Sequence, residues 1–146
     1  MAHRAFFSFH YESDVTRASV VRNSEALKNR PSEFIDASLW EEAKKKGDKA
    51  VQKLIDDALV GTTVTVVLIG SETSTRRWVN YEIDESEKRA NGLLGVYIHR
   101  IKDLDGDNAS KGKNPLPSKY KTYDWVDDDG YTNLGSWVDA AYDQAK

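Results

Sequence analysis

Short runs of apolar residues alternate along this chain with longer stretches in which apolar residues recur every three or four positions. The clearest run covers residues 63–69 (TVTVVLI) and is followed directly by Gly70. A β-branched and aliphatic run of this length predicts a strand that is buried on both faces of a parallel sheet. Weaker runs predict further strands at residues 5–9, 34–36, 93–101 and 123–126.

The helical pattern is strongest in the stretch that ends near Gly61, a typical C-terminal capping residue. Apolar residues of this stretch fall at i, i+3, i+4, i+7 and i+8, and they are Val51, Leu54, Ile55, Ala58 and Leu59. A weaker pattern predicts a helix at residues 15–28, with Asp14 as its N-cap. Two more helices are predicted at residues 79–90 and 134–141.

Strands that alternate with helices predict an α/β protein with a parallel sheet, right-handed crossovers and helices on both faces. We expect a flavodoxin-like three-layer sandwich whose five strands lie in the order 2-1-3-4-5. No internal repeat is visible, so residues 1–146 are predicted to form a single domain. Residues 102–122 are polar and include two prolines, which predicts a long surface loop.

Composition and charge are typical of soluble globular proteins and exclude several functions. Apolar residues make up 39% and charged residues 31% of the 146 positions, and the formal net charge is −3. Since acids and bases are mixed, we expect no binding to nucleic acid or anionic lipid. The absence of cysteine excludes disulfides and thiolate chemistry. No signal peptide and no apolar run of roughly 20 residues is visible, so we expect a cytoplasmic protein.

The ends of the first and third predicted strands are the first candidate site. In a 2-1-3-4-5 sheet these strands are neighbours whose following helices lie on opposite faces, and ligands bind at such a switch point. The first strand runs into a polar segment, and the third ends at a glycine and a serine. We therefore expect His10, Tyr11 and Ser71 to line a crevice, beside the helix that carries Glu82.

Trp78 and Glu82 lie four residues apart, on one face of their predicted helix. This face is one residue's rotation from the apolar stripe of Val79 and Ile83, so we expect both side chains at the margin of the core, partly desolvated. A carboxylate there could accept hydrogen bonds from a ribose or stabilise the oxocarbenium-like state of N-glycosidic cleavage. The alternative is that Trp78 and Tyr11 only pack and that Glu82 is solvated.

Other chemical sites are disfavoured by their spacing. The acidic segment 103–107 lacks the glycine and glutamate positions of a calcium loop, and the three histidines have no metal-ligand spacing. Neither a P-loop nor a GxGxxG motif occurs. A phospho-receiver domain would need acidic residues where this chain has Phe9-His10 and Gly70-Ser71. The sequence therefore predicts no metal site and no bound cofactor.

Five segments, taken together, resemble a Toll/interleukin-receptor (TIR) domain, and more narrowly the TIR-like proteins of the bacterial Thoeris anti-phage system. The segments are FFSF at residues 6–9, DASLW at 36–40, LIGS at 68–71, Trp78-x-x-x-Glu82, and YDWVDDDGY at 123–131. The resemblance covers residues 1 to about 101 and resumes at residue 123. Each segment alone is a weak signal, whereas the combination is specific.

The resemblance implies an activity and a set of site residues. Enzymatic TIR domains cleave NAD⁺ between nicotinamide and ribose with the glutamate of the Trp-x-x-x-Glu pattern, which implies Glu82 as the catalytic residue. NAD⁺ would then be a substrate and not a cofactor. The candidate substrate-binding residues, from the motifs and the predicted crevice together, are Ser8, Phe9, His10, Tyr11, Asp36, Ser71 and Trp78.

The Thoeris resemblance further implies a cyclic ADP-ribose isomer as product, made upon infection to switch on a partner effector that consumes NAD⁺. Two other functions remain open. The chain could be a non-catalytic TIR module that signals by assembling into a homo-oligomer. It could also be similar to nucleoside deoxyribosyltransferases, which share the fold type and a catalytic carboxylate.

Overall fold

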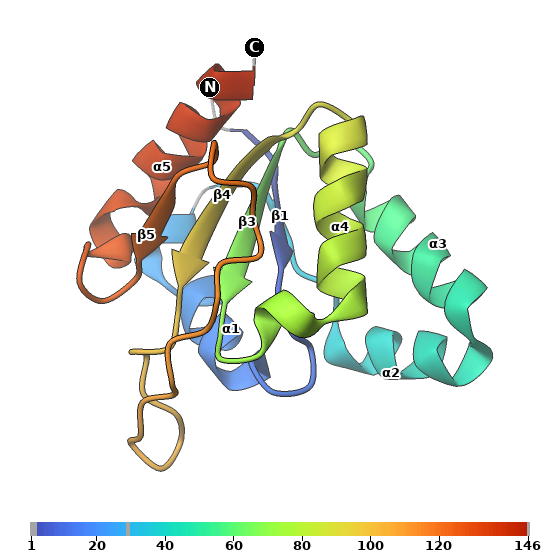
Figure 1. Cartoon of the computed structure of the whole chain (residues 1–146), viewed down its shortest axis with the longest axis horizontal. Helices are drawn as coiled ribbons and strands as arrows, with labels where there is room; N and C mark the ends of the chain where they lie inside the picture. The colour runs from blue at the N-terminus through green and yellow to red at the C-terminus, as the bar shows by residue number, and fades with distance from the viewer. Residues whose placement is uncertain (1–2, 29, 146) are drawn as a thin grey trace.

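A computed structural model describes residues 3–28 and 30–145 and contains one parallel sheet (Figure 1). Within these residues the sheet has five strands in the order β2-β1-β3-β4-β5, and each neighbouring pair is parallel. The strands are β1 (Ala5–Ser8), β2 (Ser32–Glu33), β3 (Val64–Ile69), β4 (Gly92–Tyr97) and β5 (Thr122–Asp124). The predicted strand order and the flavodoxin-like α/β class are therefore confirmed.

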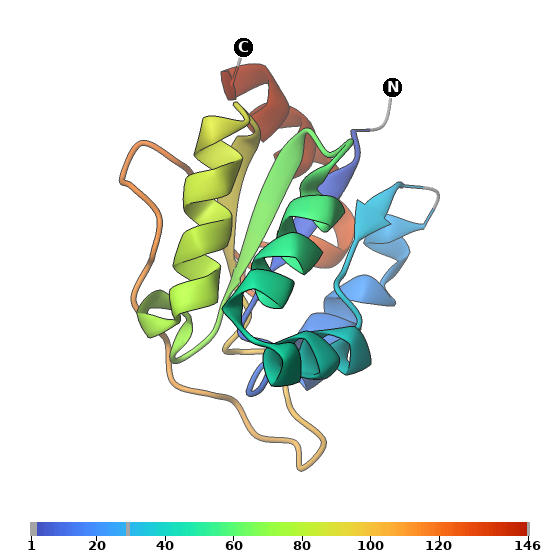
Figure 2. The same ribbon diagram turned by 90° about the vertical axis from the view of Figure 1, so that its right-hand side faces the viewer.

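The helices cover both faces of the sheet (Figures 1 and 2). α3 and α4 lie on one face, and α1 and α5 lie on the other. The described helices are α1 (Val15–Arg22), α2 (Ala37–Lys46), α3 (Asp48–Leu59), α4 (Arg77–Lys88) and α5 (Gly130–Ala145), with the short 3-10 turns η1 (Glu25–Leu27) and η2 (Thr73–Thr75). None of the described helices is both long and apolar enough to cross a membrane.

The central strand β3 is buried along its whole length, as its apolar run predicts. Val67 and Ile69 pack against Val79 and Ile83 of α4. The alternate side chains of β3, which are Val64, Val66 and Leu68, belong to the larger core cluster. Helices cover both faces of the sheet at β3, so the side chains on both faces are buried. The run therefore does not alternate between apolar and polar residues.

Helix α3 follows its predicted stripe, with Val51, Ile55 and Leu59 fully buried. The helix ends at Leu59, and Gly61 adopts a left-handed φ of +80° two residues later. Nothing lies within 4 Å of a side chain placed at Gly61, so the backbone conformation, and not space, favours glycine there.

Two N-terminal elements differ from their predicted bounds. The second strand is Ser32–Glu33 instead of residues 34–36, and the ring of Phe34, which follows it, stacks on Phe7 at 4.3 Å. The first helix ends at Arg22 instead of residue 28. Ser24 ends it by donating its amide and its hydroxyl to the carbonyl of Val21, at 3.2 and 2.7 Å.

Other elements were missed or cut short. Helix α2 had no predicted counterpart, and Asp36 is its N-cap, whose carboxylate accepts the amide of Ser38 at 2.8 Å. β4 ends at Tyr97 instead of residue 101, where the chain turns and the amide of Ile101 bonds to the carbonyl of Ile98. β5 begins one residue earlier than predicted and ends at Asp124. The Asp124 carboxylate there accepts the amides of residues 126 and 127 in a turn.

Residues 102–121 form the predicted long loop, without helix or strand. Leu116 is buried in the cluster beneath α4, so this segment covers part of the sheet where a helix would otherwise pack. On the opposite face, the buried Arg17 of α1 donates to the carbonyls of Ile101 and Asp107 at 2.7 and 3.0 Å. The loop is thus tied to the fold at its start and in its middle.

Candidate active site

Glu82 lies in the middle of α4 and has no exposed surface. Two hydroxyl groups donate to its carboxylate from sequence positions more than 70 residues away. The Ser8 hydroxyl, at the end of β1, lies 2.6 Å from one oxygen, and the Tyr11 hydroxyl lies 2.8 Å from the other. Each carboxylate oxygen therefore has one donor, which satisfies the buried group.

The surroundings of Glu82 act on its pKa in two directions. Burial raises the pKa to about 8, while the hydrogen bonds from Ser8 and Tyr11 favour the carboxylate and oppose this rise. Burial, and then the charge of Glu82, raise the pKa of Tyr11 well above its usual value. We predicted that Glu82 would be only partly desolvated. It is fully buried instead, because the buried face of α4 includes Glu82 together with Val79, Ile83 and Ser86.

A cavity of about 220 Å³ lies next to Glu82 and Tyr11. It is enclosed by the segment after β1, by α2 and by the start of α4. The ring of Tyr11 stacks on Trp40 at 4.1 Å, and Trp40 meets Trp78 edge-on at 6.4 Å. The residues that line the cavity are Phe9, His10, Tyr11, Glu12, Trp40, Lys44, Arg76, Arg77, Trp78 and Val79. Flat aromatic walls of this kind suit heterocyclic rings.

Three cationic side chains surround the cavity, and each has an exposed acidic partner. Lys44 pairs with Glu12, Arg76 with Glu72 at 2.7 Å, and Arg77 with Asp48 at 2.9 Å. Exposed pairs of this kind are worth little, so the cations can exchange these partners for an anionic ligand. Burial and the nearby Arg76 lower the pKa of His10, which keeps its imidazole neutral at pH 7.

The family model described as "Thoeris protein ThsB, TIR-like domain" matches residues 6–103, which include every element of this site. The chain belongs to the ThsB TIR-like family. A relative from Bacillus cereus (strain MSX-D12), with the name "Putative cyclic ADP-D-ribose synthase ThsB1", is 38% identical over 191 aligned positions. The alignment covers 94% of this chain and all of the relative. Because 191 positions exceed the length of this chain, the relative contains additional segments.

The structure brings six of the eight predicted site residues of this ThsB-family chain together. Ser8 and Tyr11 hold Glu82, while Phe9, His10 and Trp78 line the cavity beside them.

The remaining two predicted site residues lie elsewhere. Asp36 caps α2 and lines a different, smaller pocket of about 180 Å³, and Ser71 is exposed in the turn after β3. Next to Gly70, between the ends of β1 and β3, the buried Asp14 carboxylate accepts the Thr73 hydroxyl at 3.4 Å. Burial raises the pKa of Asp14 to about 6. The cavity therefore opens towards α2 and α4 and not along the β1–β3 crevice.

Six residues that line the cavity were not among the predicted site residues, namely Glu12, Trp40, Lys44, Arg76, Arg77 and Val79. Trp40 and Lys44 lie on α2, an element that the apolar pattern did not reveal. Arg76 and Arg77 directly precede the Trp-x-x-x-Glu motif, and this adjacency was the available signal.

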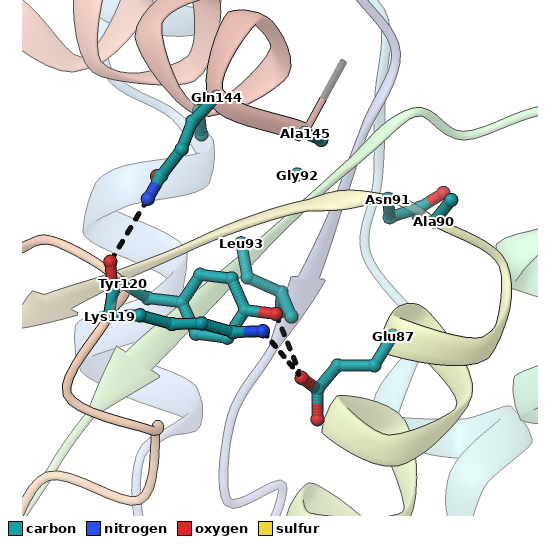
Figure 3. A pocket seen from close by; sticks show the side chains of 10 residues that line it. Glu87, Ala90, Asn91, Gly92, Leu93, Lys119, Tyr120, Gln144 and Ala145 are labelled. Atoms are coloured by element: carbon teal, nitrogen blue, oxygen red, sulfur yellow. Dashed lines mark hydrogen bonds and ion pairs between the residues drawn. The ribbon is translucent and has the colours of Figure 1, made fainter.

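A second cavity, of about 280 Å³, lies at the opposite end of the sheet, where β4 begins (Figure 3). There Tyr120 donates to Glu87 at 2.8 Å, and the ammonium group of Lys119 lies 3.9 Å from the same oxygen. Glu87 is exposed, and none of the described residues that line this cavity has a buried titratable side chain. Among the described residues, no cluster of three acidic or histidine side chains could hold a metal ion. We therefore assign the candidate site to the smaller cavity beside Glu82.

Proposed function

We propose that this ThsB-family chain is an NAD⁺-processing enzyme of anti-phage defence. It cleaves the bond between nicotinamide and ribose and closes the ADP-ribosyl group into a cyclic isomer, which activates a partner NAD⁺-consuming effector. The observation that carries this proposal is the buried Glu82 carboxyl, held by two hydroxyl donors beside an aromatic and cationic cavity. The name of the Bacillus cereus relative supports the same reaction.

Glu82 would act on the positive charge that develops during cleavage. When the C–N bond to nicotinamide breaks, its electron pair leaves with the nicotinamide nitrogen, and the ribose becomes oxocarbenium-like. A carboxylate fixed in a water-poor site stabilises this charge strongly. Attack by a nucleophilic group of the same molecule closes the ring, with release of a proton, whereas attack by water gives linear ADP-ribose.

The cavity suits a dinucleotide in two further ways. Trp40 and Trp78 present aromatic surfaces for the nicotinamide or adenine ring. Arg76, Arg77 and Lys44 are the cations within reach of the two phosphates, and guanidinium groups bind phosphate oxygens in a bidentate manner. These contacts bind the substrate, while Glu82 acts on the bond that breaks.

The experiment compares the parent protein with Glu82→Gln and with Glu87→Gln, a matched change at an exposed position of the same helix. Each protein is incubated with NAD⁺ and, separately, with deoxynucleosides, and the products are separated by mass. We expect the parent and Glu87→Gln to release nicotinamide and a cyclic product. Glutamine keeps the shape of the neutral acid but cannot become an anion, so Glu82→Gln should be slower by about 10²–10³.

Three results would contradict the proposal or favour an alternative. Parental turnover by Glu82→Gln would remove Glu82 from the mechanism. Base exchange on deoxynucleosides with no NAD⁺ cleavage would favour a deoxyribosyltransferase. Self-association of the parent with no turnover of any substrate would favour an assembly module. Coexpression with the partner effector tests the signalling step, since Glu82→Gln should then leave cellular NAD⁺ undepleted during infection.

A further inference from the structure

Glu82 and the cavity are neighbours, but they are not in contact with each other. The carboxyl group has no exposed surface and does not line the cavity, whereas the Tyr11 side chain does both tasks of lining the cavity and bonding to Glu82. A group that acts on a substrate must come within about 3 Å of it. In the arrangement that the structure shows, the Tyr11 side chain occupies the approach to Glu82.

We propose that Ser8 and Tyr11 are positioning residues for Glu82, and that the Tyr11 side chain acts as a door. The Tyr11 ring must move away from Glu82 before a ligand can reach the carboxyl group. This inference rests on the proposed function only for its consequence in turnover. The positions of Ser8 and Tyr11 and the movement of the Tyr11 ring are properties of the protein without a ligand.

The two donors differ in how firmly the backbone holds them. Ser8 is fully buried at the end of β1 and pairs with Val67 in the centre of the sheet, so the backbone that carries its hydroxyl is held by the sheet. Tyr11 lies in the turn between β1 and α1, which is closed by a bond from the amide of Asp14 to the carbonyl of His10. Ser8 is therefore the fixed donor, and Tyr11 is the donor that can move.

Three contacts keep the door closed. The Tyr11 hydroxyl bonds to Glu82 at 2.8 Å, and its ring stacks on Trp40 at 4.1 Å and leans on Phe9 at 4.4 Å. A ligand with a flat ring can replace the stacking on Trp40. Water or a hydroxyl of the ligand can replace the lost donor to Glu82, so that opening leaves no buried polar group unpaired.

Removal of the Tyr11 ring and removal of its hydroxyl alone shift the pKa of Glu82 in opposite directions. Removal of the phenol hydroxyl alone takes away a bond to the carboxylate and raises the pKa of Glu82. Removal of the whole ring admits water, and because burial is the largest cause of the raised pKa, the pKa should then fall. The other titratable or charged groups near the door, which are His10 and Glu12 on the turn, Lys44 on α2, and Arg76 and Arg77 on α4, line the cavity and are unchanged in both variants.

The test is a ¹³C NMR titration of the Glu82 carboxyl, assigned with Glu82→Gln, in the full-length protein. We expect Tyr11→Phe to raise the pKa by about one pH unit, since a hydrogen bond to a charged group has this order of effect. Ser8→Ala should raise it as well. Tyr11→Ala should lower it towards the solvated value of about 4.3. Tyr120→Phe is the control, because it removes a tyrosine–glutamate bond of the same 2.8 Å length at the far end of α4 (Figure 3).

Opposite shifts in Tyr11→Phe and Tyr11→Ala support the closed state of the door, since a ring that did not shield Glu82 from water would not separate the two variants in sign. Shifts of the same sign, or none, would overturn it. If Tyr11→Ala does not fold, Trp40→Leu removes the stacking partner instead, and an unchanged or raised pKa in that variant overturns the door equally. The titration needs no substrate, so a parent protein that leaves NAD⁺ intact would refute the proposed function without touching this result. Where turnover is measurable, the rising limb of kcat/KM in Tyr11→Phe should move to higher pH by the same amount as the pKa.

Discussion

The burial of Glu82 should make the stability of this protein fall as the pH rises through the neutral range. The pKa of Glu82 is raised from 4.5 to about 8 in the folded state. Because the folded state holds this proton more tightly than the unfolded state, the contribution is fully present below pH 4.5 and is lost as the pH rises towards 8. Most carboxylates in proteins, with lowered pKa values, act in the opposite direction.

The size of the effect follows from the same two values. Each pH unit between them costs about 1.4 kcal/mol of unfolding free energy, and less near pH 8, where the folded state also titrates. Between pH 6 and pH 8 the loss is about 2 kcal/mol. For a slope of about 2 kcal/mol per molar urea, this is a decrease of about 1 M in the unfolding midpoint. Asp14, with its pKa raised to about 6, adds a similar loss mainly at lower pH.

The assay is urea unfolding from pH 5 to pH 8.5 for the parent, Glu82→Gln and the exposed control Glu87→Gln. Subtracting the curves of parent and Glu82→Gln cancels Asp14 and every other group, and leaves Glu82 alone. Relative to the parent, the urea midpoint of Glu82→Gln should rise by about 1 M between pH 6 and pH 8. The midpoint of Glu87→Gln should change with pH as that of the parent does. Parallel curves for parent and Glu82→Gln would show that Glu82 is ionised or solvated in the folded protein, and the reasoning would fail.

Two further predictions concern the scaffold. Ile55→Ala should lower the unfolding free energy by about 2–5 kcal/mol, because Ile55 is completely buried, while the exposed Lys45→Ala should stay within about 0.5 kcal/mol by the same urea assay. Gly70→Ala should cost about 1–3 kcal/mol, because the added methyl group would overlap the Asp14 carboxylate, and thermal unfolding of Gly70→Ala at an unchanged midpoint would contradict this close approach.

The sheet was predictable because burial leaves a period in the sequence. The run at β3 and the stripe of α3 each state which side chains face the core, and strand order follows from the handedness of the crossovers. The errors fall where a single side chain decides the end of an element. Phe34 stacks on Phe7 directly after the last residue of β2, and Ser24 ends α1 through its own hydroxyl. Such contacts depend on the tertiary fold, so the periodicity does not contain them.

The arrangement of the candidate site was predictable only in part. Glu82, Tyr11 and Ser8 were reached through a motif and through the position of strand ends, but the bond between them spans more than 70 residues and has no local signature. Trp40 belongs to the DASLW segment but was not predicted as a site residue, because α2 carries only two buried residues and its pattern is dominated by exposed charges. We expected an open crevice beside Ser71. The Asp14 carboxylate and its partner Thr73 lie there instead.

The cost of Glu82 to the fold is itself an argument about function. At pH 8 a glutamine in its place would keep the same shape and could still accept a hydrogen bond, without the penalty of a buried ionisable group. A chain under selection for stability alone has no reason to keep the acid at a position of zero exposure. Carboxyls with pKa values raised towards neutrality by burial, and lying beside a cavity, are concentrated at catalytic sites. The buried acid, its two hydroxyl donors and the movable Tyr11 ring are therefore best understood as one device that keeps an ionisable carboxyl group in place and out of water until a ligand arrives.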